Sequence, residues 1–236
     1  MSKNTKGKCR FCNKEFSRVS IIRHLSSCKA RKNELESNHG KKTGYYELFI
    51  TDKYLKDYWL VIEIDETLKL KDLDQFIRDI WVECCGHLSS FTINGQSYDV
   101  SPSEDYFWGP PPKNMNIQLK KILNVGQKFE YMYDFGSATE LVLSVKGYRE
   151  GYSQKDKLII LARNNPPEII CNFCNNNFAN YFDPEAEYFD RKPFICTECI
   201  ENNQEKIDYD EIYLYPVCNS PRMGVCGYEG STEYPD

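Results

Sequence analysis

The sequence has no long apolar stretch, since no run of hydrophobic residues approaches the roughly 18 that a membrane-spanning helix needs. It opens without the apolar segment that marks a secretory signal peptide. It contains 11 cysteines, which is an odd number. These features argue against a disulfide-stabilised secreted domain. We therefore expect a cytoplasmic protein without a membrane partner, whose cysteines are reduced and available to bind metal.

The chain has a formal net charge of −5, but its charged residues are distributed unevenly along the sequence. Residues 1–44 carry 12 lysines and arginines against 3 acidic residues, whereas the rest of the chain carries 18 against 32. A basic segment on an acidic chain indicates that this segment meets a polyanion. The alternative is a solvated, charged tail.

A short cysteine motif opens the basic segment. Cys9 and Cys12 form a Cys-x-x-Cys knuckle, and His24 and Cys28 follow with a four-residue spacing that places both on one side of a helix. Zn²⁺ takes four such ligands in a tetrahedron. With a helix over residues 17–25, the segment resembles a Cys-Cys-His-Cys variant of the two-cysteine, two-histidine zinc finger.

The finger is surrounded by cations, and we expect phosphate contact rather than base-specific reading because one finger covers only about 3 bp. The residues expected to contact nucleic acid are Lys14, Arg18, Arg23, Lys29, Arg31 and Lys32. A finger that docks a protein, or simply caps the chain, is the alternative. Residues 31–44 have little apolar content and are expected to form a linker, so that deleting residues 1–40 would leave the next domain folded.

The central region has the pattern of one amphipathic helix among strands. Apolar residues recur at helical spacing over residues 68–84, and Asn94-Gly95 is a strong hairpin signal. The expected strands cover residues 45–51, 59–64, 88–93, 96–100, 128–135, 139–148 and 157–162. This order predicts an α+β fold, a mostly antiparallel sheet with helices on one face.

Several central residues carry a family resemblance: Tyr58, Trp59, Leu68, Leu73, Ile77, Trp81, His87, Leu88, Phe91, Lys128, Phe129, Tyr131, Tyr133, Asp134, Phe135 and Gly136. In this order they resemble the plasmid pRiA4b ORF-3-like family over residues 45–165. Segments 161–167 and 216–228 resemble a zinc-bearing branch of it. The resemblance implies a small α+β domain loosely associated with plasmids and insertion elements, without an established activity. The finger is an added module.

Two residues of the resembling block could transfer protons. His87 and Asp134 would form an acid–base pair if they met in space. The simpler interpretation is that Asp134 caps the turn at Gly136, while His87 fills the helix–strand junction with Cys84 and Cys85. Those adjacent cysteines are not expected to share a metal ion, and we assign no catalytic residue, because the sequence shows no third group.

A second cysteine motif follows the central region. Its four predicted ligands are Cys171, Cys174, Cys196 and Cys199. Paired knuckles at this separation predict a closed, four-thiolate zinc ribbon; a thioredoxin-like redox pair is less consistent, because no βαβ pattern surrounds them. Cys218 and Cys226 are separated too widely for a knuckle and are interpreted as buried thiols.

The sequence thus predicts a zinc finger (1–30), a linker (31–44), an α+β domain (45–165) and a zinc ribbon with a tail (166–236). We expect a non-enzymatic protein with two Zn²⁺ sites and a nucleic-acid-associated or adaptor role linked to mobile elements. One alternative is an enzyme or small-molecule binder that uses loop 101–113 as a lid. Another is a protein–protein interaction module.

Overall fold

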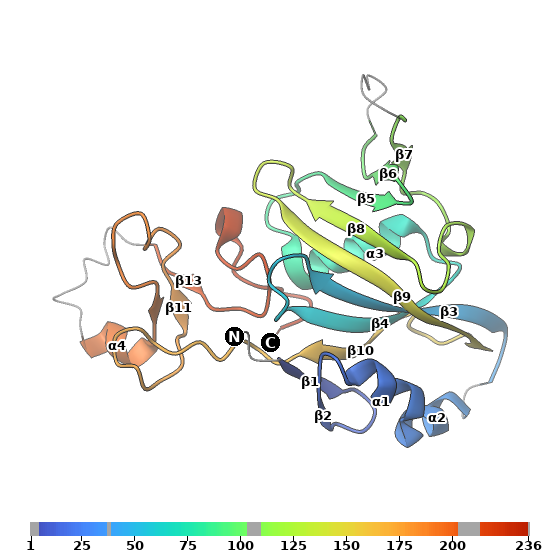
Figure 1. Cartoon of the computed structure of the whole chain (residues 1–236), viewed down its shortest axis with the longest axis horizontal. Coiled ribbons are helices and arrows are strands. Elements are labelled where there is room, and N and C mark those ends of the chain that lie inside the picture. The colour runs from blue at the N-terminus through green and yellow to red at the C-terminus, as the bar shows by residue number, and fades with distance from the viewer. Residues whose placement is uncertain (1–4, 37–38, 103–109, 203–212, 236) are drawn as a thin grey trace. The chain divides into compact units, whose positions relative to one another are not determined.

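The computed structural model describes residues 5–36, 39–102, 110–202 and 213–235 (Figure 1). Its contacts divide the chain into two compact units. Unit 1 comprises Met1–Ile77 and His87–Asn165, and unit 2 comprises Arg78–Gly86 and Pro166–Asp236. The four intervals inferred from the sequence stay predictions. Most of loop 101–113 lies outside the described residues.

Unit 1 is built on one large sheet with the strand order β2-β1-β10-β4-β3-β9-β8-β5-β6-β7. Neighbouring strands are antiparallel, apart from the parallel pair β6 and β7, which confirms the expected antiparallel sheet. The strands are β1 (Lys6–Cys9), β2 (Glu15–Ser17), β3 (Lys42–Asp52), β4 (Trp59–Asp65), β5 (Ser89–Ile93), β6 (Gln96–Asp99), β7 (Lys113–Asn114), β8 (Lys128–Tyr133), β9 (Thr139–Tyr152) and β10 (Leu158–Asn164).

The helix α3 (Leu70–Ile77) is shorter than the sequence predicts. It buries its apolar face, and its buried Asp74 accepts hydrogen bonds from Ser89 Oγ at 2.7 Å and Tyr131 OH at 2.8 Å. These bonds fix α3 to β5 and β8. The expected helix to residue 84 continues beyond Ile77 only as a wider π-helical turn over Arg78–Val82, closed by the bond from Glu83 N–H to Arg78 O.

The finger lies against this sheet through the short helix α1 (Ile21–Ser27), which α2 (Lys29–Glu36) follows (Figure 1). One buried cluster joins them: Cys9, Ile21, Leu25, Cys28, Trp59, Val61, Ile159, Leu161 and Ala162. Because side chains alternate along a strand, Leu60 points to the opposite face. Leu60 pairs with Ile50 of β3, Ile50 pairs with Leu143 of β9, and Leu143 pairs with a residue of β8. Because directly paired residues point to the same face, Leu60 lies on the face of the sheet that α3 covers. Finger and α3 therefore cover opposite faces.

Strand β1 forms where the sequence has almost no strand signal. Gly7-Lys8-Cys9 pairs with β10, and Thr5 Oγ1 accepts a hydrogen bond from Trp59 Nε1 at 3.0 Å. A Cβ on Gly7 would stand 2.1 Å from Arg163 O, so only glycine allows this close approach. The pairing, rather than local propensity, makes this segment a strand.

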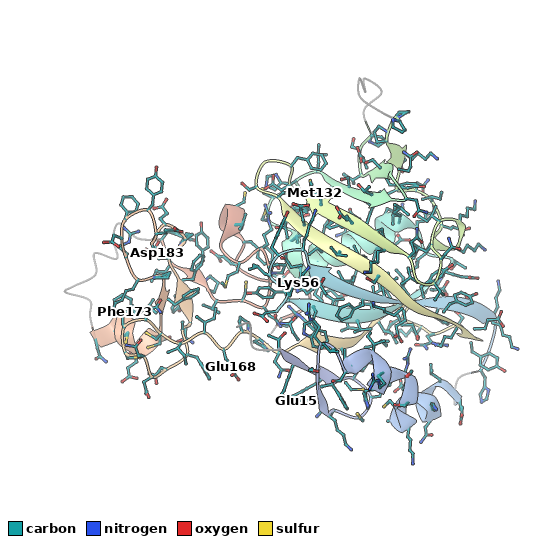
Figure 2. The ribbon with its side chains drawn as sticks, viewed as in Figure 1. Glu15, Lys56, Met132, Glu168, Phe173 and Asp183 are labelled. Carbon is teal, nitrogen blue, oxygen red and sulfur yellow. The ribbon has the colours of Figure 1, made fainter. Side chains whose placement is uncertain are left out.

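Unit 2 is small and rich in loops. Besides the π-helical turn Arg78–Val82, its elements are β11 (Tyr181–Phe182), β12 (Phe194–Ile195), β13 (Tyr215–Pro216), α4 (Thr197–Asn202) and the 3₁₀ turn Val225–Gly227. The strands pair in the order β12-β11-β13. Phe173 packs on the ribbon cysteines, and Asp183 accepts a hydrogen bond from Arg191 Nε at 2.8 Å (Figure 2). Among the described residues, no helix has the length and apolar character that crossing a membrane requires.

Candidate metal centres and a basic groove

The structure brings the four predicted finger ligands together. The ligand atoms of Cys9, Cys12, His24 and Cys28 all lie within 4.8 Å of one another, and Cys12 Sγ is 3.3 Å from His24 Nε2. The knuckle closes through a bond from Asn13 N–H to Cys9 O, with Asn13 at φ +57°. Three soft sulfurs and one imidazole at this spacing can hold a metal ion.

Local electrostatics prepare the finger ligands for a cation. Burial lowers the pKa of His24, and the positive charge of Lys14 lowers it further, so the imidazole is kept in the neutral form that ligates metal. Burial raises the pKa of Cys9. Burial also opposes ionisation of Cys12, but the Lys14 N–H and neighbouring thiols outweigh it and lower the Cys12 pKa.

The ribbon ligands also converge. Cys171, Cys174, Cys196 and Cys199 have sulfurs within 4.8 Å of one another, with Cys174 and Cys196 3.9 Å apart. Thiolates about 2.3 Å from a tetrahedral Zn²⁺ would be ~3.8 Å apart. Burial opposes ionisation of Cys171, but N–H groups led by that of Cys174 lower its pKa to about 6. Burial raises the pKa of Cys199 to about 12, so full ionisation of this cluster needs a cation.

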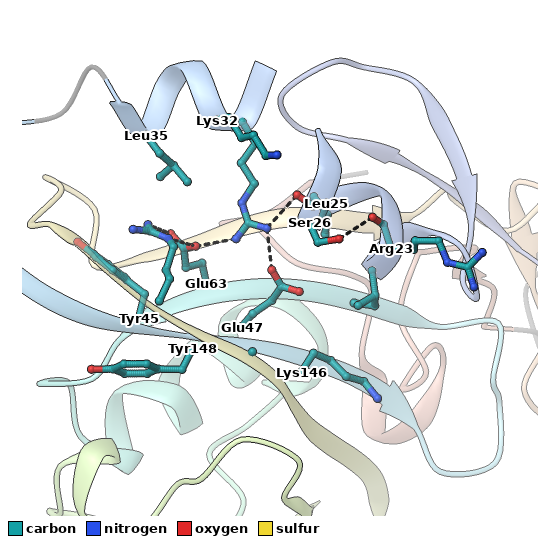
Figure 3. Close-up of a pocket in the computed structure, with 14 residues that line it drawn as sticks. Arg23, Leu25, Ser26, Lys32, Leu35, Tyr45, Glu47, Glu63, Lys146 and Tyr148 are labelled. Atoms are coloured by element: carbon teal, nitrogen blue, oxygen red, sulfur yellow. Dashed lines mark hydrogen bonds and ion pairs between the residues drawn. The ribbon is translucent and has the colours of Figure 1, made fainter. Parts of the chain in front are cut away.

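A groove of about 410 Å³ lies between the finger helices and the sheet (Figure 3). Its lining comes from α1, α2, β3, β4 and β9: Ile22, Arg23, Leu25, Ser26, Arg31, Lys32, Leu35, Tyr45, Glu47, Glu63, Lys146, Gly147, Tyr148 and Arg149. Five of these residues are cationic and two are acidic, so the groove is positively charged.

The two groove carboxylates are already engaged by arginines. Arg31 Nη1 is 2.8 Å from Glu47, and Arg31 Nη2 is 2.8 Å from Glu63. Arg149 donates from Nε to Glu63 at 2.8 Å. The predicted nucleic-acid contact by Arg31 is therefore wrong, because Arg31 is only 7% exposed and its donors bind protein carboxylates.

The other predicted cations keep exposed positions. Lys14, Arg23, Lys29 and Lys32 are exposed and Arg18 is half-buried. Arg23 and Lys32 line the groove, as does the exposed Lys146 of β9. Lys146 and its neighbours were not predicted as site residues, because they come from the sheet. A signal was present in Glu63, a carboxylate between two isoleucines in strand β4.

His87 and Asp134 also meet within unit 1. His87 Nε2 is 3.5 Å from Asp134 Oδ2, and the His87 ring packs edge-on against Tyr133, 5.7 Å between centroids. Asp134 adopts φ +63°, and its Oδ1 accepts a hydrogen bond from Gly136 N–H at 3.0 Å. Asp134 thus caps the turn as expected and also pairs with the histidine.

A match to a family model agrees with the residues that carry the resemblance. The family model described as plasmid pRiA4b ORF-3-like protein matches residues 52–186, more than half of the chain. The crystal structure of a protein of unknown function, MM3350 from Methanosarcina mazei Go1, is similar at 18% identity. That alignment covers 51% of this chain and 69% of the other, with a TM-score of 0.43. No curated protein matches this chain. The chain belongs to the plasmid pRiA4b ORF-3-like protein family.

Proposed function

We propose that this protein is a zinc-stabilised binding protein whose finger face contacts the phosphate backbone of nucleic acid. The observation that carries the proposal is the groove between α1, α2 and β9. Its carboxylates are held by Arg31 and Arg149, so the exposed charges of Arg23, Lys32 and Lys146 remain available to an external anion. Phosphate contacts of this kind supply most sequence-independent affinity.

Backbone binding fits the finger better than base reading does. Helix α1 has only seven residues, and Ile21 and Leu25 are buried against the sheet. Ser17 and Ser20, near the start of the helix, hydrogen-bond to each other at 2.9 Å between their Oγ atoms. The face of α1 that packs against the sheet cannot enter the major groove of DNA, and its outward face presents mainly charged side chains.

Zinc is the metal we propose for both predicted centres. One has three sulfurs and one imidazole nitrogen, and the other has four sulfurs. Tetrahedral sites with these donors are typical of structural Zn²⁺, with every coordination position filled by protein. A closed centre stabilises a fold and leaves no position for a substrate.

A salt series tests the nucleic-acid role. The full-length protein and the variant Arg23→Ala/Lys32→Ala/Lys146→Ala are titrated with double-stranded DNA and RNA. We expect weaker binding by the variant and a shallower dependence of affinity on salt, by roughly 0.9 in log–log slope for each DNA phosphate that the variant leaves unneutralised. The control, Lys120→Ala/Lys121→Ala/Lys128→Ala, removes the same charge from exposed positions outside the groove.

Two results would contradict this role: no binding by the full-length protein, or equal salt slopes for the groove variant and its control. Either would favour the adaptor role, with the finger face as a protein-docking surface. The proposed link to mobile elements rests on family membership and needs its own test, which is binding to the ends of a plasmid or insertion element in preference to unrelated DNA.

A second candidate function follows from the 3.5 Å contact between His87 and Asp134. A histidine held by a carboxylate can act as a general base, so the family block could serve an enzyme or a small-molecule binder. A reaction catalysed by the full-length protein and abolished in both His87→Gln and Asp134→Asn would support it. Retained turnover in either variant would leave the pair with its turn-capping role.

A further inference from the structure

Three more thiols gather within unit 2, and none of them belongs to either predicted centre. Cys84 and Cys85 follow the π-helical turn, and Cys226 lies in the 3₁₀ turn Val225–Gly227. Cys84 Sγ is 3.7 Å from Cys85 Sγ, which is 3.8 Å from Cys226 Sγ. All three sulfurs lie within 4.8 Å of one another, although Cys226 is 141 residues from Cys85 in the chain.

These separations fit one shared metal ion and not a covalent bond. A disulfide brings two sulfurs to about 2.05 Å, and none of the 11 cysteines is so paired. Thiolates on a tetrahedral Zn²⁺ stand ~3.8 Å apart, given a Zn–S distance of about 2.3 Å. The two separations between neighbouring sulfurs match that edge, as does the 3.9 Å separation in the ribbon.

Hydrogen bonds within unit 2 hold the tail beside Cys84 and Cys85. Ser220 Oγ donates to Trp81 O at 2.6 Å, and Ser231 Oγ donates to Asp79 O. The intervening Arg222 has its side chain fully buried and donates from its backbone N–H to Ser220 Oγ at 2.9 Å. The cysteines of the two segments are thus brought together by packing that does not depend on sulfur.

A buried cation lies beside this cluster. Arg222 Nη2 lies 3.5 Å from Cys84 Sγ, which favours the thiolate that ligates metal.

The backbone at Cys226 is adapted to this position. Cys226 adopts φ +51° and ψ +41°, a left-handed conformation that is uncommon for a non-glycine residue. It turns between Gly224 and Gly227, which also have positive φ. A Cβ on Gly224 would lie 2.3 Å from the Phe182 ring. The chain accepts this strain where it presents a sulfur to the cluster.

We propose that Cys84, Cys85 and Cys226 bind a third zinc ion. This assignment corrects our interpretation of the Cys84–Cys85 pair as junction filler and of Cys226 as a buried thiol, since Cys226 is exposed. It leaves Cys218, which is buried, as the one cysteine outside the three groups.

Metal content of full-length, zinc-loaded protein tests the site. We expect Cys226→Ser to lose one zinc per chain relative to the unmodified protein, by elemental analysis. The matched control is Cys218→Ala, a change in the same tail that should keep the full complement. The test compares the zinc content of each variant with that of the unmodified protein. An error in the finger or ribbon assignment would therefore change both values equally and would not produce this difference.

Thiol labelling provides a second readout that needs no variant. Cys85 and Cys226 are exposed, so as free thiols they would react quickly with N-ethylmaleimide. We expect both to be protected in zinc-loaded protein and labelled after chelation, as mapped by mass spectrometry. Equal labelling before and after chelation would overturn the proposal. So would unchanged zinc content in Cys226→Ser, or a Cys85–Cys226 disulfide in the reduced, zinc-loaded protein.

Discussion

The finger and the ribbon present similar ligands but stand in different surroundings. Around the finger ligands, the buried cluster includes Trp59, Val61 and Leu161 from the large sheet. Around the ribbon ligands, the buried cluster consists of three of the cysteines and Ile195, with partly buried neighbours from unit 2. The finger therefore has an apolar core without its metal, whereas the core of the ribbon is largely the metal site itself.

This difference indicates what each metal contributes. Ion binding and folding are expected to be one event in the ribbon, because so few apolar side chains are buried there. In the finger, the metal would fix a segment that strand pairing and the Arg31 ion pairs already hold on the sheet. The two regions should therefore respond differently when a ligand or a neighbouring segment is removed.

The largest effect is expected for Cys171→Ser. Structural Zn²⁺ contributes about 10–16 kcal/mol of binding free energy in small domains, and Cys171 is fully buried in the ribbon cluster. We expect one zinc per chain to be released, with amide hydrogen exchange rising across residues 168–200 and staying slow in the large sheet. A variant that keeps its full zinc content would contradict the four-thiolate centre.

Deleting residues 1–40 should give the next largest effect. It would expose the finger-facing sides of Trp59, Val61 and Leu161, each worth about 1.5–3 kcal/mol when buried. We expect the free energy of unfolding, measured by urea denaturation, to fall by about 5 kcal/mol, contrary to the independent module that the sequence predicts. Lys29→Ala/Lys32→Ala is the control, since it changes only exposed charges. An unchanged midpoint for the deletion would show that the finger is a free module.

The smallest effect concerns His24 in metal-free protein. Burial lowers the pKa of His24 in the docked finger, so the unfolded state takes up the proton first as pH falls. The stability from neutral His24 is therefore complete above about pH 6.5 and is lost as pH falls through the lowered pKa. NMR titration should place this pKa below that of the urea-unfolded chain. Equal values would mean that the finger undocks without metal.

The sequence predicted those parts of the site that are local in the chain. Paired knuckles and the four-residue step from His24 to Cys28 were sufficient to name eight ligand residues, and the structure brings each set together. The strands of the central sheet were also recognisable, because alternation and the turns at Gly95 and Gly136 are local signals. Metal binding at these sites stays a prediction.

Parts that depend on distant segments could not be predicted in this way. Cys226 joins Cys85 only through the packing of the tail, and Arg31 meets Glu47 and Glu63 only once α2 lies on the sheet. Arg31 looked like one more cation in a basic segment. Its burial is decided by carboxylates on other strands, which no spacing rule connects to it.

The pairing of β1 with β10 has a consequence for solubility. Strand β10 begins with the apolar run Leu158-Ile-Ile-Leu161, which has high β-propensity, and the finger hairpin occupies backbone groups on the outer side of its second half, from Leu161 to Asn164. The sheet then ends at β2, a strand of only three residues that includes Glu15. Short, charged outer strands discourage other chains from adding on, whereas a long apolar one invites them. Displacing the finger would leave the second half of β10 without a partner and lengthen the open edge of an apolar strand, so in a zinc-starved cell this protein would be at risk of aggregating before it unfolds.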